Sequence, residues 1–297
     1  MKAQIELANQ DNSSYRKLKD RIFFWFIVVM SVVTISPIVM IIGKLVVKGF
    51  RQFNFNFFTQ TTPDTFEAMM AVSQGEIIPG GILNGITGSL LVVVLASVMA
   101  IPLGVIIGIY LYENQAKRYA GLIRSIADVL QGVPSIVLGL ISYLWIVKHV
   151  TTGFSALAGS VSLCIMMLPL IIRSTEETMK MIPTSIKEAG LALGVPYYKI
   201  ILRVLIPTGF SGLMTGILLA ISRIIGETAP LMLTTLGSPV VNMNIAKPTS
   251  AVPLLIWEFY NDPNMVDLIW SSSLFLMGFV LTLNIISKRI AAKRRTI

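Results

Sequence analysis

The sequence predicts an all-α integral membrane protein with six transmembrane helices, and three observations lead to this fold class. Apolar residues make up 54% of the 297 residues, and charged residues only 13%, well below the ~25% of an average soluble domain. The apolar residues are concentrated in long runs, and a helix that crosses a bilayer needs about 20 of them. Lysine and arginine are distributed unevenly between the segments that connect these runs.

Each apolar run is a candidate membrane span. The apolar part of the first is longer than the ~7–15-residue core of a signal peptide, and no A-x-A-like cleavage site follows, so we expect an uncleaved anchor. The second, third and fifth runs are long enough to tilt or to extend beyond the bilayer. The predicted spans are residues 22–42, 83–110, 122–147, 154–172, 208–233 and 266–286.

The basic residues predict the orientation of these spans. With the N-terminus inside, 18 of the 24 lysines and arginines fall in inner segments, 5 fall in outer segments, and Arg223 lies within a span. Cytoplasmic loops are enriched in lysine and arginine, so we expect both termini in the cytoplasm. The net charge of +9 is then a property of these loops, and no nucleic-acid partner is expected.

Two outer segments, residues 43–82 and 234–265, mix aromatic and polar residues with proline. They are expected to be connecting loops anchored by their aromatic rings, or segments that lie along the interface or face an external partner. The polar residues 1–21 are expected to form a mobile cytoplasmic tail.

Small residues at four-residue steps predict which helix faces pack together. In membranes, helices approach closely where small side chains recur at this spacing. The second and fifth spans both carry such a stripe: Ala96, Ala100, Gly104 and Gly108 in the second, and Gly212, Gly216 and Ala220 in the fifth.

Arg223 and Glu227 are predicted to lie on the same face of the fifth helix as Gly216, one on each side of it. An arginine in a membrane helix costs about 2.5–3.5 kcal/mol, so it is a functional candidate. One interpretation is mutual neutralisation at i, i+4, although the order Arg then Glu is the weaker one. The other is a fixed positive charge on an anion's path, because a guanidinium binds tetrahedral oxyanions through two parallel hydrogen bonds. The residues alone indicate an anion or proton pathway.

Other polar and proline positions have structural interpretations. Arg173 directly follows the fourth apolar run and is expected to reach the interface with its side chain, and Arg124 is expected to pair with Asp128. Membrane helices tolerate prolines where other groups satisfy the freed carbonyls. Kinks are therefore expected at Pro102, Pro134, Pro169 and Pro230.

The sequence offers no catalytic or metal-binding constellation. It has one histidine, His149, and one cysteine, Cys164. The P-loop pattern G-x-x-x-x-G-K-[ST] is absent, and the Gly43–Lys44 pair is followed by leucine. We therefore expect no cofactor or metal in this chain and no enzymatic activity of its own; ATP-driven work would need another subunit.

The segment EAGLALGVPYYKIILRVLIP, residues 188–207, resembles the signature loop of bacterial ABC importer permeases. The family pattern is E-A-A-x-x-x-G, nine residues, then I-x-L-P. The spacing is intact: Glu188, Ala189, Gly194 and Pro207 match, whereas Gly190 replaces the second alanine and Val204 and Ile206 are conservative departures.

In that family the segment is a short coupling helix that docks into a groove of the ATPase subunit. Here residues 184–193 are amphipathic and would present Ile186, Ala189 and Leu193 to a partner groove. Thr184 or Ser185 could cap the start, and Gly194 is suited to end the helix. A loop helix that lies on lipid is the alternative.

Residues 80–113, 127–140, 168–177 and 216–234 resemble the PstA-type permeases of phosphate importers, and Gly-Glu-Thr-Ala-Pro at 226–230 distinguishes them from the sister PstC type. The resemblance implies a type I ABC importer permease (MetI-like) fold in the bacterial cytoplasmic membrane. The partners that it implies are a PstC-like permease, two PstB-like ATPases that bind ATP and magnesium, an extracellular phosphate-binding protein and surrounding lipid. The implied substrate-path residues are Arg223, Glu227 and Arg173.

The resemblance also implies an organisation of the chain. A cytoplasmic tail, residues 1–21, comes first, and the first span with its extracytoplasmic segment, residues 22–79, follows. The permease core is residues 80–290 and contains the coupling loop, residues 174–207. A basic tail, residues 291–297, comes last.

An importer for another oxyanion, such as sulfate, molybdate or phosphonate, is the nearest alternative function. An autonomous ion-coupled secondary transporter is another, although no inverted repeat is obvious.

Overall fold

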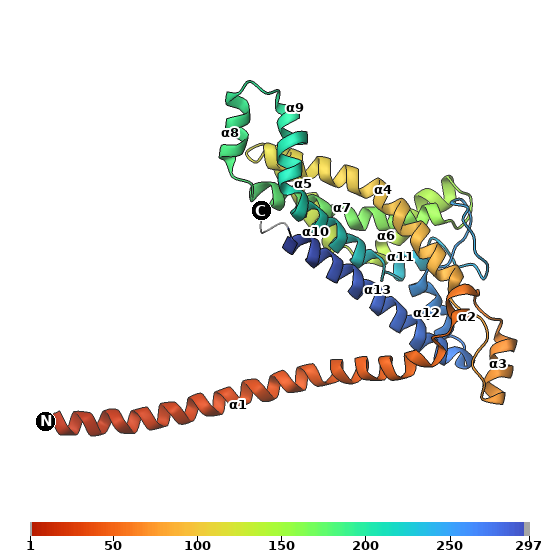
Figure 1. The fold of residues 1–297 in the computed structure, drawn as a ribbon, viewed down its shortest axis with the longest axis horizontal. Coiled ribbons are helices and arrows are strands. Elements are labelled where there is room, and N and C mark those ends of the chain that lie inside the picture. Colours follow the sequence, from red (N-terminus) through yellow and green to blue (C-terminus); the bar gives the residue numbers. More distant parts are fainter. Residues whose placement is uncertain (1, 294–297) are drawn as a thin grey trace.

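The protein is described by a computed structural model, which covers the backbone of residues 2–293 and the side chains of residues 15–290. The described chain contains helices and no β-strand, which confirms the all-α prediction. Five helical segments are long and apolar enough to cross a membrane, and a bent helix pair adds a sixth if it is one span. Figure 1 shows these helices as a slanted bundle from which α1 (Lys2–Gly49) projects as one long helix.

Three helices form the centre of the bundle: α4 (Leu83–Glu113), α7 (Ala156–Lys180) and α10 (Ile206–Ile224). In the most apolar 18-residue stretch of α7, 67% of the residues are buried, against 28% in the corresponding stretch of α4. This difference places α7 in the middle, with α4 and α10 packed on it. α7 also continues two turns beyond the predicted end at residue 172.

The two stripes of small residues lie where α4 and α10 contact α7. A Cβ atom on Gly104 would lie only 2.7 Å from Ile171, and one on Gly212 only 2.5 Å from Thr178. Such distances leave no room for a side chain, so the glycines allow the backbones to approach. The other members of the stripes are also buried against this core: Ala96, Ala100, Gly108, Gly216 and Ala220.

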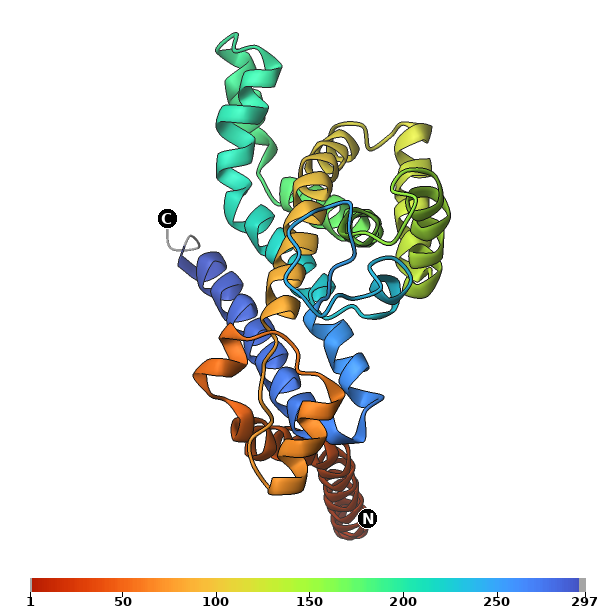
Figure 2. The ribbon, with the colours of Figure 1, turned by 90° about the vertical axis from the view of Figure 1, so that its right-hand side faces the viewer.

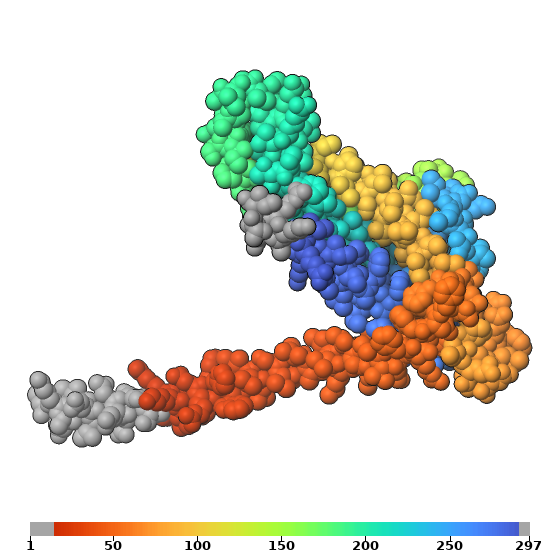
Figure 3. Space-filling view, viewed as in Figure 1, coloured from red at the N-terminus to blue at the C-terminus, as the bar shows by residue number. Residues whose placement is uncertain are grey.

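α13 (Val266–Lys293) packs along α10 and meets the end of α1 near Gly49. The rest of α1 leaves the bundle, and none of its most apolar window is buried. Figure 3 shows α1 standing apart from the other helices. Residues 2–21, predicted to be a mobile tail, continue the helix without a break; their mobility stays a prediction.

The third predicted span is not one straight helix. α5 (Arg118–Gly132) and α6 (Ser135–Ser142), which continues as the π-helical η2 (Tyr143–Val147), form an angle of 104°. Pro134 causes the break, because proline disfavours the helical region for the preceding residue and Val133 is extended, with φ −71° and ψ 130°. Figure 2 shows the bent pair beside α4 and α7, on the side away from α13.

The fifth predicted span is also divided. The helix begins before residue 208, as α9 (Tyr197–Ile200) and the π-helical η3 (Ile201–Leu205), and α10 ends at Ile224. A separate short helix, α11 (Ala229–Met232), starts at Ala229–Pro230, where proline fits a first helical turn but not a helix interior. Glu227 therefore lies in the connection after α10, which corrects its predicted position on the helix.

The two segments predicted to be outside lie together at the end of the bundle opposite α8 (Thr184–Ala192) and α9 (Figure 1). They contain η1 (Phe50–Gln52), α2 (Phe55–Thr59), α3 (Thr65–Gln74), α12 (Val252–Tyr260) and η4 (Pro263–Met265). Phe57 is buried among residues of α12 and α13. These segments therefore form a packed cap of the bundle in addition to connecting spans.

Gly88 in α4 gives a direct test of this packing. A Cβ on Gly88 would collide with the backbone carbonyl oxygen of Ser250, which cannot rotate away. We expect Gly88→Ala to destabilise the folded protein by about 1–3 kcal/mol, the usual cost of overpacking. Thermal unfolding of the detergent-solubilised protein measures this. Gly278→Ala in α13, where a Cβ meets nothing within 4 Å, is the control, and equal melting temperatures would contradict the packing.

Candidate functional site

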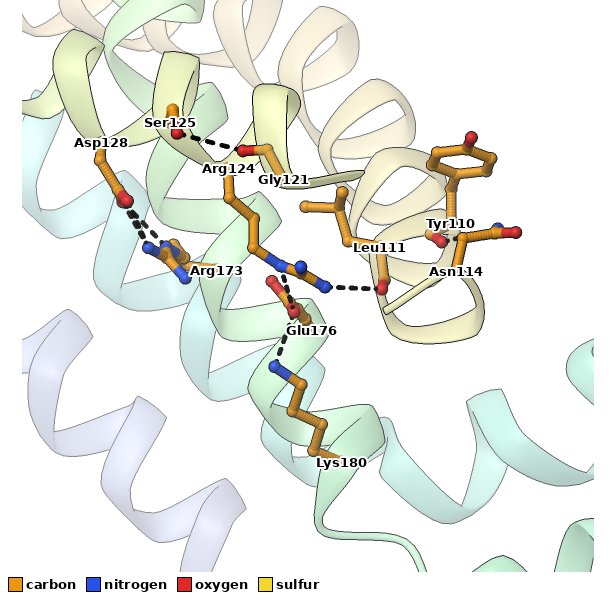
Figure 4. Close-up of polar contacts among 10 residues, drawn as sticks. All are labelled: Tyr110, Leu111, Asn114, Gly121, Arg124, Ser125, Asp128, Arg173, Glu176 and Lys180. Carbon is orange, nitrogen blue, oxygen red and sulfur yellow. Dashed lines mark hydrogen bonds and ion pairs between the residues drawn. The ribbon is translucent and has the colours of Figure 1, made fainter. Parts of the chain in front are cut away.

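Arg173 in α7 forms a two-pronged ion pair with Asp128 in α5. Its Nε lies 3.0 Å from Oδ1 and its Nη2 lies 2.6 Å from Oδ2 of Asp128 (Figure 4). The predicted Arg124–Asp128 pair is therefore wrong, because the bend at Pro134 and the packing of α5 on α7 bring Asp128 to Arg173 instead. Arg173 does not simply reach to the interface, since its charge is matched by a neighbouring helix.

Glu176, one turn further along α7, is the centre of a second charged group. Its side chain is 1% exposed, and its Oε1 accepts hydrogen bonds from Arg124 Nε at 2.8 Å and Lys180 Nζ at 2.6 Å. Arg124 also donates to the carbonyl oxygen of Leu111 at 2.9 Å. These contacts, drawn in Figure 4, join α4, α5 and α7 near the end of the bundle that carries α8.

Arg223 is held far more loosely. Its Nε lies 3.9 Å from Glu227 Oε1, beyond hydrogen-bonding distance, and half of its side chain is exposed. Glu227 is on the connection after α10, so it does not fix the guanidinium as a helical neighbour would. The interpretation in which the two charges simply neutralise each other is thus weakly supported by the geometry.

Arg223 and Arg173 lie at different depths in the bundle. α10 packs on α7 so that Gly216 contacts Ser174, the residue after Arg173. Arg223 is seven residues beyond Gly216, which is roughly 10 Å along a helix at 1.5 Å per residue. The two guanidinium groups therefore belong to different levels of the bundle.

The predicted helix of the signature segment is present as α8, which is followed by Gly194, with φ +70°. Pro183 occupies the N-cap, so the prediction that Thr184 or Ser185 caps the start is wrong. Ile186 packs inward against Ile200 and its neighbours, which corrects its predicted outward position. The exposed residues of α8 and its end include Glu188, Ala189, Leu191 and Leu193, of which Leu193 is 82% exposed.

Other residues of the signature segment have structural positions. Gly190 lies against Ile200, and a Cβ atom on this glycine would lie only 3.0 Å from the isoleucine side chain. An alanine here would require the Ile200 side chain to shift by a few tenths of an ångström. Pro207 is the second residue of α10 and directly follows the π-helical η3 in the helical segment Tyr197–Ile224.

Lys187 connects α8 to the end of α4 and was not identified from the sequence. Its Nζ lies 2.6 Å from Glu113 Oε2, and above the rings of Tyr197 and Tyr112 at 4.9 Å and 5.7 Å. Burial by itself would lower the pKa of Lys187, but the hydrogen bonds and charge attraction of Glu113 and Tyr197 together outweigh it and raise this pKa. A separation of 74 residues leaves no local sequence pattern that could predict the pair.

The described residues contain no cluster of three or more histidine, cysteine, aspartate or glutamate side chains that could hold a metal ion. The arrangement instead places cationic groups along a helix bundle. Such groups can bind an anion transiently, since transport requires that binding be weak enough to allow release.

Comparison with known proteins identifies relatives along the whole chain. Residues 100–294 match the family described as "Binding-protein-dependent transport system inner membrane component". The phosphate transport system permease protein PstA of Yersinia pestis is 34% identical over 296 residues, covering 99% of this chain and 97% of its own. The protein of the same name from Xylella fastidiosa strain 9a5c is 37% identical, and the match covers 81% of this chain and 81% of its own. The one from Mycobacterium leprae is 33% identical, and the match covers 94% of this chain and 91% of its own.

Solved structures agree on the fold. An inward-facing structure of the MetNI methionine ABC transporter aligns with a TM-score of 0.58 at 20% identity, covering 70% of this chain and 94% of the aligned chain. At this identity the likeness concerns the fold alone, and it is the MetI-like importer permease fold. The chain therefore belongs to the family of inner membrane components of binding-protein-dependent transport systems.

Proposed function

We propose that this chain is the transmembrane permease subunit of an ATP-driven importer of inorganic phosphate in the bacterial cytoplasmic membrane. The observation that carries the proposal is the match to phosphate transport permeases over nearly the full chain. The half-exposed, loosely paired Arg223 supports it, because a guanidinium fork suits a tetrahedral oxyanion.

The test of the substrate is uptake of radiolabelled phosphate by phosphate-starved cells that lack this chain, with and without its restoration. We expect uptake to return with the wild-type chain and to be inhibited by arsenate but not by sulfate. Restored uptake that sulfate, molybdate or a phosphonate inhibits instead would assign another oxyanion. Unchanged phosphate uptake on deletion, in cells with no second system, would contradict the proposal.

The ATPase partners are proposed to dock on α8. Its exposed face combines Glu188 with the small Ala189 and the apolar Leu191 and Leu193, a surface that an amphipathic helix offers to a groove. Two PstB-like ATPases would bind ATP and magnesium and supply the energy. The bias of lysine and arginine supports a cytoplasmic position for α8 and both termini.

A PstC-like permease and lipid are proposed to cover the apolar faces. The membrane part of α1 is unburied, and an apolar groove of about 710 Å³ between α4, α10 and α13 is lined by residues such as Val94 and Phe279. An extracellular phosphate-binding protein would deliver substrate at the opposite end, where α2, α3 and α12 lie. Transport then follows alternating access, with Arg223 and Arg173 as successive contacts and Asp128 as the counter-anion that phosphate displaces from Arg173.

Glu188→Lys tests the docking surface. The change reverses one exposed charge on α8, so we expect the permease to insert normally but to lose co-purifying ATPase subunits and phosphate uptake. We expect uptake to fall on the order of tenfold, because two charges of the same sign that face each other across an interface repel. Affinity purification and uptake measure it, with Asp20→Lys, at an exposed acidic residue of α1, as the control. Wild-type ATPase association in Glu188→Lys would remove Glu188 from the interface.

A further inference from the structure

α8 is attached to the membrane helices by an apolar cluster, which includes Ile186 of α8 and Tyr112 of α4, and by an ion pair. α8 packs on α9 and η3 within its own hairpin, and Figure 3 shows this hairpin projecting from the bundle. The ion pair of Lys187 with Glu113 reaches outside the hairpin, to the last residue of α4. A displacement of α8 therefore acts on α4 at this point.

The pair is built to resist separation. The side chains of Lys187 and Glu113 are 27% and 16% exposed, so water screens their attraction much less than that of a surface pair. The ammonium group also lies over the rings of Tyr112 and Tyr197, and a cation over an aromatic face is attracted to it. Separating the charges would leave a carboxylate and an ammonium group in a partly buried, aromatic environment, which is costly.

The charge of Lys187 persists at physiological pH. The pKa of Lys187 is raised in the folded protein. The pair's contribution to the stability of the folded protein is therefore fully present below the ordinary lysine pKa, about 10.4, and is lost only as the pH rises further. Lys187 is therefore charged at neutral pH in this structure, as the ion pair with Glu113 requires.

α4 continues from this point into the core of the bundle. Its stripe of small residues lies directly on α7, and α7 carries Arg173 and Glu176. Close-packed helices transmit displacement because their interface leaves no space to absorb it. A movement that starts at α8 therefore reaches the helix with the paired arginine.

We propose that Lys187 and Glu113 are positioning residues that form the mechanical link between α8 and α4, through which closure of the ATPase subunits moves the translocation path. This inference rests on the proposed function as an ATP-driven permease. It assigns the pair a role in coupling that is separate from docking, which belongs to the exposed side of α8.

The experiment uses the complete complex with its ATPases, reconstituted in liposomes with the binding protein and phosphate. For Lys187→Met, we expect ATPase subunits to stay bound and basal ATP hydrolysis to remain within about twofold of wild type. Stimulation of hydrolysis by the binding protein and phosphate uptake should both fall about tenfold or more, because both require that movement pass between α8 and α4. Glu113→Gln should behave in the same way.

Two further variants separate a link from general support of the hairpin. The charge exchange Lys187→Glu with Glu113→Lys is expected to recover much of the stimulation, and Lys187→Arg to retain most of it. Lys117→Met is the control, since Lys117 is exposed on the neighbouring connection. Wild-type stimulation and uptake in Lys187→Met would overturn the inference, and so would loss of the ATPase subunits from that variant.

Failure of the underlying function has a different signature. A wild-type complex whose ATP hydrolysis the binding protein stimulates, but which accumulates no phosphate, would contradict phosphate as substrate. Stimulation of ATP hydrolysis by the binding protein would still measure the link between α8 and α4. Loss of this stimulation in Lys187→Met would still support the link.

Discussion

Replacing Arg223 with alanine is expected to lower phosphate uptake at least tenfold in a complex that still assembles. Hydrogen bonds to charged groups contribute about 1.5–3 kcal/mol each, and 1.4 kcal/mol corresponds to about a factor of ten. The guanidinium has no hydrogen bond to Glu227, from which it lies 3.9 Å away. Its removal therefore breaks little within the chain and acts mainly on the passing anion.

Two matched variants make this result specific. Arg223→Lys keeps the charge but not the planar fork, so we expect intermediate uptake if two parallel hydrogen bonds matter. Arg118→Ala removes an exposed arginine from the start of α5 and should leave uptake unchanged. Uptake by Arg223→Ala at the wild-type rate, at equal amounts of assembled complex, would remove Arg223 from the path.

Replacing Glu176 with alanine is expected to produce the largest loss of stability. Glu176 is 1% exposed and neutralises both Arg124 and Lys180. Removal of one partner from a buried ion pair costs about 3–5 kcal/mol, because the remaining charge is left uncompensated. We therefore expect a marked fall in the amount of folded protein in the membrane and in the melting temperature of the purified complex.

Glu177→Ala is the control for this change, because the neighbouring Glu177 is exposed. A second variant separates lost charge balance from lost packing. Arg124→Met combined with Glu176→Leu removes both charges and keeps apolar volume, so it should recover part of the stability that Glu176→Ala loses. If Glu176→Ala melts at the wild-type temperature, the central role of Glu176 is wrong.

Some features follow from local sequence and were predictable. Long apolar runs specify membrane helices because the bilayer leaves backbone groups no partner other than their own helix. The prolines at 134 and 230 specify the breaks in the third and fifth predicted spans. The prolines predicted kinks in continuous helices, whereas the structure has breaks at these positions. Glu227 was therefore predicted to lie on a helix but lies between α10 and α11.

The ion-pair partners were not predictable in the same way. Asp128 is 45 residues from Arg173, and Arg124 is 52 residues from Glu176. The i, i+4 pair of Glu176 with Lys180 was visible in the sequence, but the burial that makes Glu176 important was not.

The sequence by itself therefore determined the all-α membrane fold, the small-residue stripes and the signature helix, because each depends on residues within a few turns of one another. Only the tertiary structure decided that Arg173 is paired while Arg223 is nearly free, and that Lys187 joins α8 to α4. The physical reason is that the rotation and register of packed helices, set by the contacts of the whole bundle, determine which distant charges meet.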